Sequence, residues 1–175
     1  MIVGLGSASW TMVRDLAGRL PMMLLPRWLE NRSQPVGIED VLGALVAGLT
    51  VPLPLSTFWD LAGPEALSGR EILVATARLL GLRPFLIGVP LVTPRLSSYW
   101  IRFVTRVPPA LARELVEGLR TDLLPIRPGF FAAAGLPEPA TFEAAARLAL
   151  AQERLAERGA SPATVSSEAV GKEGT

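Results

Sequence analysis

The sequence predicts an α/β protein with one domain, in which short apolar strands alternate with amphipathic helices. Its 175 residues fit a single domain, and a hydrophobic content of 50% is enough to form a core. Apolar runs typical of short buried strands occur at residues 1–3, 22–25 and 84–89. Between these runs the apolar residues recur with the period of about 3.6 that is typical of helices. We therefore expect several helices packed around short strands.

The first strand, residues 1–3, runs directly into a turn that contains Gly4, Gly6 and Ser7. Gly-x-Gly between a strand and a helix is part of the dinucleotide-binding fingerprint, but Ser9 replaces the third glycine. We therefore favour a simple strand-to-helix turn over the fingerprint. In the helix that follows, the expected buried residues are Trp10, Val13, Leu16, Ala17 and Leu20, and the expected outward residues are Arg14, Asp15 and Arg19.

A polar loop separates the second strand from the next helix. Strand 22–25 is ended by Pro26, which cannot donate to a β ladder. Gln34 is held extended because Pro35 follows it, and a brief strand at 36–37 comes next. The loop is rich in side chains that can form hydrogen bonds, which are Arg27, Trp28, Glu30, Asn31, Arg32, Ser33 and Gln34. The two arginines could clamp a carboxylate or a phosphate, or they could form surface ion pairs with acids such as Glu30.

A helix is expected from residue 38 because the apolar spacing becomes helical there. Glu39 and Asp40 lie in its first turn, where the helix dipole favours negative charge. We interpret Asp40 as such an anion rather than as an acid catalyst. The apolar positions on one face are Ile38, Val41, Leu42, Leu45, Val46 and Leu49.

Short sequence patterns also predict the strands and helices that follow. A strand is expected at 56–61, where β-branched and aromatic residues gather. Ser68 and Glu71 have the spacing of a capping box, so a helix should start there and end at Gly81. The apolar run at 84–89 should again be extended.

Three further helices are expected in the C-terminal half. The first is capped by Thr93, with Leu96, Trp100 and Phe103 on one face, and the second starts at the two prolines 108–109. Thr141 caps the third, which should reach about residue 158. The domain therefore spans residues 1–158, and residues 159–175 form a disordered tail because they are small and polar.

Composition excludes several classes of function. With 17 basic and 16 acidic residues the net charge is +1, which gives no electrostatic argument for nucleic acid. The sequence contains neither cysteine nor histidine. Disulfides, thiol nucleophiles, histidine-based triads and thiolate or imidazole metal sites are therefore excluded.

Residues 41–59 form an uncharged run of the length that a membrane-spanning helix needs. Pro52 and Pro54 lie inside it, so we favour a soluble helix followed by a turn. The segment after Met1 shows no basic region of a secretory signal. We therefore expect a cytoplasmic protein, with a peripheral membrane protein as a less favoured alternative.

Three blocks of sequence carry a family resemblance: LPRWLENRSQPVGIEDVLGALV, FWDLAGPEALSGREIL and TPRLSSYWIRFVTRVPPALARELVEGL. In this order and spacing they resemble the C-terminal half of atypical extended short-chain dehydrogenases/reductases, the NmrA-like or NAD-dependent epimerase-like NAD(P)H-binding proteins. The resemblance extends from Val3 to about Ala151. It implies an α/β fold that is the C-terminal portion of a Rossmann-type protein, without the N-terminal nucleotide-binding half.

The resemblance also implies roles for particular residues. The opening segment looks like the one that closes over the nicotinamide end of NAD or NADP, so that Gly4, Gly6 and Ser7 would border the cofactor. Asp40 would lie at the seam between the nucleotide-binding and substrate-binding parts. The residues that would face the substrate pocket are Arg27, Arg32 and Gln34, with Tyr99 in the core or the pocket wall.

The chain departs from that family where members carry out catalysis. The glycine-rich loop of the nucleotide-binding half is absent, and so is the Tyr-x-x-x-Lys pair, because Tyr99 is the only tyrosine and Phe103 stands four residues later. Hydride chemistry of the family's type therefore has no general acid, and no catalytic residue is assigned.

Two accounts of these departures remain open. One is a truncated or split coding sequence, and the other is a module that pairs with a Rossmann-domain partner chain or with itself. Apolar surface left by a missing half would favour association in either case. The favoured function is the substrate-binding half of an NAD(P)-dependent oxidoreductase or epimerase-like protein, inactive unless complemented. The alternative is a non-catalytic NAD(P)H-binding or assembly subunit.

Overall fold

The computed structural model describes residues 1–19, 22–52, 58–83, 85–89, 107–118 and 121–159. Within them the fold is α/β, with six helices and three small two-stranded sheets, and it is compatible with part of a Rossmann-like fold. The helices are α1 (Ala8–Arg19), α2 (Ile38–Gly48), α3 (Gly69–Leu79), α5 (Pro109–Gly118), α6 (Phe130–Ala133) and α7 (Phe142–Glu157), and η1 (Arg27–Glu30) is a 3-10 turn. The strands are β1 (Ile2–Val3), β2 (Met22–Pro26), β3 (Arg32–Ser33), β4 (Val36–Gly37), β5 (Leu67–Ser68) and β6 (Phe85–Val89).

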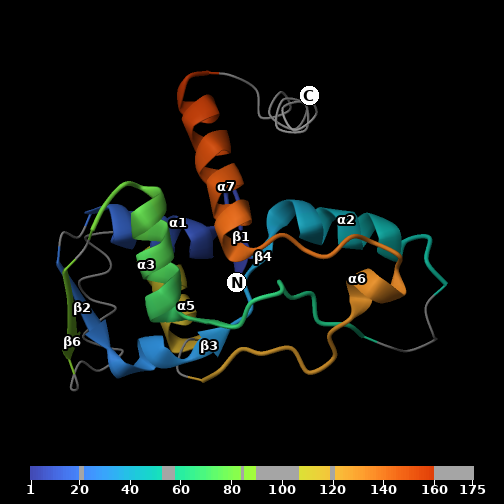
Figure 1. Ribbon diagram of the computed structural model, residues 1–175, viewed down its shortest axis with the longest axis horizontal. Coiled ribbons are helices and arrows are strands. Elements are labelled where there is room, and N and C mark those ends of the chain that lie inside the picture. The colour runs from blue at the N-terminus through green and yellow to red at the C-terminus, as the bar shows by residue number, and fades with distance from the viewer. Residues whose placement is uncertain (20–21, 53–57, 84, 90–106, 119–120, 160–175) are drawn as a thin grey trace, which may run out of the picture.

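The sheets join segments that are distant in the sequence. β1 and β4 pair in parallel near the middle of the molecule, with Val3 opposite Gly37. β2 and β6 form a longer parallel pair, with Leu24 opposite Ile87, and β3 and β5 pair antiparallel. In Figure 1, α2 and α6 lie to one side of β1 and β4, whereas α1 and α3 lie to the other, and α7 projects from the centre.

The main core lies where α1, α3 and α7 meet. Trp10 of α1 is fully buried, and alanines on α3 and α7, such as Ala77 and Ala146, let the helices approach closely. Val3 joins the same cluster, so the core also supports the end of β1. Close packing of small side chains against one large ring is typical of such helix contacts.

Most of the expected helix boundaries that fall on described residues are confirmed. The Glu71 backbone N–H donates to Ser68 Oγ at 3.2 Å, and the Ser68 backbone N–H donates to Glu71 Oε2 at 2.8 Å, which completes the capping box. Gly81 follows α3 with a φ of +75°, and Thr141 Oγ1 accepts the Ala144 N–H at 3.3 Å. The strand that Pro26 ends and the extended segment before residue 90 are also present.

Asp15, expected to point outward, is buried at 5% exposure. It lies beside Arg14, which reaches both Asp15 and Glu153 of α7 with nitrogen-oxygen distances of 2.7 Å. Burial disfavours the charge on Arg14, but its hydrogen bonds to Glu153 and Asp15 outweigh this effect, and the pKa of Arg14 is raised. The prediction was wrong because two arginines of the same helix pair with the carboxylate, Arg14 at 2.7 Å and Arg19 at 3.8 Å, and a paired carboxylate can be buried.

The strand expected at 56–61 is also not found over the part that the structure describes, residues 58–61. There the chain is a loop. Its Asp60 accepts hydrogen bonds from the backbone N–H groups of Ile126 and Arg127, at 2.8 and 2.9 Å. A carboxylate that bonds two distant amides fixes this segment without a strand ladder.

The helix expected from residue 38 is confirmed as α2, but most of its expected apolar face points outward. Ile38 and Val41 of that face are half-buried, and Val41 packs against the cluster of α6. Leu42, Leu45, Val46 and Leu49, which we call the α2 stripe, are 50% to 85% exposed. The opposite face holds the helix in place, because Ala44 is buried beside Phe130 and Phe131 of α6.

The helix expected after Thr93, with Tyr99, lies outside the described residues, as does the tail beyond residue 159. Among the helices that are described, none has the length and apolar character to cross a membrane.

Candidate functional site

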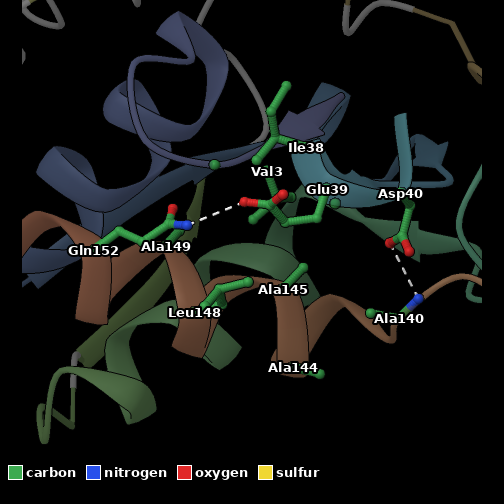
Figure 2. A pocket seen from close by; sticks show the side chains of 12 residues that line it. Val3, Ile38, Glu39, Asp40, Ala140, Ala144, Ala145, Leu148, Ala149 and Gln152 are labelled. Carbon is green, nitrogen blue, oxygen red and sulfur yellow. Dashed lines mark hydrogen bonds between the residues drawn. The ribbon is translucent and has the colours of Figure 1, made fainter. Parts of the chain in front are cut away.

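A hollow of about 190 Å³ lies at the carboxyl ends of the parallel strands β1 and β4 (Figure 2). Ligands of open parallel α/β sheets bind outside the carboxyl ends of the strands, so this is the candidate site. β1 contributes Val3 and Gly4, and β4 with the first turn of α2 contributes the facing wall. The full lining is Val3, Gly4, Gly37, Ile38, Glu39, Asp40, Ala140, Ala144, Ala145, Leu148, Ala149 and Gln152.

Two glycines bring the walls of the hollow together. A Cβ at Gly4 would lie 2.3 Å from Ile38 Cγ2, and a Cβ at Gly37 would lie 2.8 Å from Asp40 Oδ2. Both distances are too short for real atoms. At Gly4 the obstacle is the branched body of Ile38, whose Cβ would also lie 2.6 Å away, so a side chain there would push the first turn of α2 away; at Gly37 it is the end of the Asp40 side chain, which can rotate. The close approach of the turn after β1 to α2 therefore needs glycine at position 4.

The turn after β1 is built from backbone and serine hydrogen bonds. The Ser7 N–H donates to the Gly4 carbonyl at 3.2 Å, and Gly6 has a φ of +83° that glycine adopts without strain. Ser7 Oγ donates to the Ile2 carbonyl at 2.8 Å and accepts the Trp10 N–H at 3.4 Å, which caps α1. Folding alone therefore explains these residues, as the simple-turn interpretation expects.

Hydrogen bonds of polar side chains link the walls of the hollow, whose other lining residues are apolar or glycine. Gln152 Nε2 of α7 donates to Glu39 Oε1 at 3.1 Å, and Asp40 Oδ2 accepts the Ala140 N–H at 3.1 Å (Figure 2). Among the lining residues these two carboxylates and one amide are the only polar side chains. Such a set can orient hydroxyl or amide donors of a ligand, but it contains no cation for a phosphate.

The expected substrate residues are not gathered at this hollow. Gln34 donates from Nε2 to the Gly63 carbonyl at 3.1 Å, and Gly63 lines a second hollow of about 380 Å³ beside α6. Arg32 is exposed, and its backbone N–H donates to Asp122 Oδ1 at 2.8 Å. The backbone of Arg27 starts η1, but its side chain and all of Tyr99 lie outside what the structure describes.

Gly4 is thus the one expected site residue that lines the hollow, while Gly6 and Ser7 form the adjacent turn. Sequence reasoning missed Glu39 and Gln152 as site residues. The position of Glu39, just after a strand, is a signal that could have suggested it. Gln152 has no such signal, because only the packing of α7 brings it there. Within the described ranges no group of three or more acidic side chains could hold a metal ion.

Comparisons with known proteins give one informative result. No protein-family model matches the chain, and no curated protein matches it. Among solved structures, the chain is similar to a putative epimerase from Burkholderia cenocepacia J2315, with a TM-score of 0.55 and 17% sequence identity. The match covers 87% of this chain but 44% of that protein. The chain therefore spans less than half the length of this structural neighbour, and what the two share is an epimerase-like fold.

Proposed function

We propose that this chain is the substrate-binding half of an NAD(P)-dependent oxidoreductase or epimerase-like protein, inactive unless a nucleotide-binding half complements it. The observation that carries the proposal is the hollow at the carboxyl ends of β1 and β4, on a fold that matches less than half of an epimerase-like structure. Ligand sites at that end of parallel strands are a general feature of such folds.

The residues of the hollow fit the border of a cofactor but not its full binding site. Gly6, in the turn after β1, is exposed and has no side chain, so a nicotinamide group could approach the backbone at this position. A volume of about 190 Å³ is below the roughly 300–1,000 Å³ of small-molecule sites, and its lining has no basic side chain for a pyrophosphate. NAD or NADP would therefore be held mainly by the complementing half.

Chemistry in the complemented protein would use groups from both halves. The bound nucleotide would supply hydride transfer. In this chain, Glu39 and Gln152 would orient a donor group of the substrate. Arg32 and Gln34 lie away from this hollow, so they, with Arg27 and Tyr99, are proposed as substrate residues by the family resemblance alone. No Tyr-x-x-x-Lys pair is available to donate a proton, because Lys172 is the only lysine.

The first test titrates the purified 175-residue chain with NADH and NADPH and follows nicotinamide fluorescence. We expect no saturable signal and no turnover of carbonyl substrates. Saturable binding together with turnover by this chain alone would refute the inactive-half proposal.

A second test reads the DNA upstream of Met1. We expect an in-frame segment that encodes a glycine-rich strand-turn-helix and a Tyr-x-x-x-Lys pair, or a neighbouring gene that does so. The extended polypeptide, or the co-expressed pair, should bind NAD(P)H where the shorter chain does not. If neither gains binding, the substrate-half proposal fails.

A second candidate function, a non-catalytic assembly subunit, is favoured by the exposed α2 stripe. Apolar patches of this kind mark protein interfaces. Stable co-purification with a defined complex, without redox activity after addition of a nucleotide-binding half, would support this function over the first.

A further inference from the structure

The α2 stripe is an apolar surface without a partner among the described residues. Its four side chains follow the spacing i, i+3, i+4, i+7, so they form one continuous ridge along the helix. The opposite face, centred on Ala44, already packs against α6. α2 is therefore fixed in its orientation, and rotation of the helix cannot bury the ridge.

The size of the ridge makes it more than scattered surface hydrophobicity. The exposed fractions of its side chains correspond to on the order of 500 Å² of apolar surface, which is as large as the functional patches of typical monomers. Exposed apolar area of this size is costly in water, and association removes that cost.

We propose that the α2 stripe is a self-association face, through which two copies of this chain pair around a twofold axis. The absence of charge on the ridge permits a second copy as the occupant. No charged residue occurs between positions 41 and 59, so two identical ridges meet without repulsion. A lipid surface fits less well, because interfacial helices carry basic residues, whereas α2 carries only the acids Glu39 and Asp40.

The shape of the helix also suits pairing with itself. Gly43 lies beside the ridge, and nothing lies within 4 Å of the position where its Cβ would be. It therefore leaves a notch into which a leucine of the second copy can pack, as ridges pack into grooves between helices. In an antiparallel pair the two helix dipoles also oppose each other favourably.

The area available is that of a weak pair. Two ridges together would bury at most about 1,000 Å², below the roughly 1,200–2,000 Å² of stable specific interfaces and in the range of transient ones. We therefore expect a reversible dimer whose population depends on protein concentration. This inference does not depend on the proposed function, because it needs neither a cofactor nor a nucleotide-binding half.

Sedimentation velocity over a concentration series tests the pairing. We expect a monomer–dimer equilibrium for the native chain and a dimer dissociation constant at least tenfold higher for the variant Leu45→Glu/Leu49→Glu. The matched control is Ile126→Glu, because Ile126 is 88% exposed but lies off α2, between α5 and α6. It should dimerise like the native chain, and circular dichroism should show that all three proteins are folded.

A cysteine test locates the twofold axis. The chain has no cysteine, so Val46→Cys introduces one thiol near the middle of the ridge. In an isologous pair a residue near the axis meets its own copy, so this variant should form a disulfide-linked dimer under mild oxidation, whereas Ile126→Cys should not.

Several results would overturn the proposal. These are a native monomer throughout the series, an unweakened dimer in the double glutamate variant, open-ended aggregates, or equal crosslinking of the two cysteine variants. A monomer would leave the function proposed above untouched.

Discussion

Two helices of the same length, α2 and α3, differ in the burial of their apolar residues. Each has eleven residues and an apolar stripe at helical spacing. α3 buries its stripe, including Ile72 and Leu73, against α1 and α7, whereas α2 turns Leu45 and Leu49 outward and packs its alanine face. The comparison shows that apolar periodicity predicts a helix and its apolar face, but not which part of the protein, or which partner, covers that face.

The largest expected difference between the two helices is in the cost of truncating a stripe residue. Ile72→Ala should lower the free energy of unfolding by about 2–5 kcal/mol, because it opens a cavity in the core. Leu45→Ala should change it by less than about 0.5 kcal/mol, because that side chain is mostly exposed. Urea denaturation of dilute protein measures both. A similar loss for the two variants would mean that α2 is covered within the monomer.

Glycine substitutions extend the comparison to the contact between β1 and α2. Gly4→Ala should cost about 1–3 kcal/mol, because the new Cβ would collide with Ile38. Gly43→Ala, in the open middle of α2, should instead stabilise the protein by about 0.5–1 kcal/mol through helix propensity. Thermal unfolding of the two variants beside the native protein gives the signs. Equal effects would contradict the close approach of β1 to α2.

Signals contained within a few residues predicted the ends of several helices and of one strand. Ser68 with Glu71, Gly81 and Thr141 each mark a helix end through their own hydrogen bonds or backbone angle, so neighbouring sequence is sufficient to recognise them. Strand β2 was recognisable for a similar reason, because its ending proline is local.

Features that depend on distant partners were not predictable. Arg14 was expected to point outward because nothing nearby in the sequence reveals its contact with Glu153 of α7. The same limit applies to the candidate site. Gly4 was expected as a site residue through the family resemblance, but Gln152 reaches Glu39 across 113 residues of sequence. The direction of the α2 stripe is a third case, because the aromatic residues that hold Ala44 come from α6.

Removing the helix cap should have a smaller effect, confined to α3. Ser68→Ala deletes the hydroxyl that accepts the Glu71 N–H, and the loss should be about 0.5–2 kcal/mol. The first residue of α2 has no equivalent cap, because its N-cap is Gly37 without a side-chain hydrogen bond. Gly37→Ser should not stabilise α2, since a Cβ there would contact Asp40 and Ala145. Urea denaturation compares the two variants, and a gain in stability for Gly37→Ser would contradict this packing.

The smallest expected effect is the pH dependence that the cap gives to α3. Hydrogen bonds from the Ser68 backbone N–H and hydroxyl lower the pKa of Glu71 below its usual value of 4.5. A carboxyl group with a lowered folded-state pKa stabilises the fold above its unfolded pKa, and this stability is lost as the pH falls through the folded value. Because Glu71 is exposed, the contribution should be no more than about 0.5 kcal/mol.

Glu71→Gln isolates this contribution, because glutamine can still accept the Ser68 N–H but does not titrate. Between pH 6 and pH 3 the native protein should lose slightly more stability than this variant, while all other carboxylates contribute equally to both. α2 provides the control, because Glu39→Gln removes a carboxylate of similar position that accepts from the Gln152 side chain instead of capping the backbone. If Glu71→Gln and the native protein show the same acid dependence, the cap of α3 is held by its hydroxyl alone, and the carboxylate of Glu71 adds nothing to the difference between the two helices.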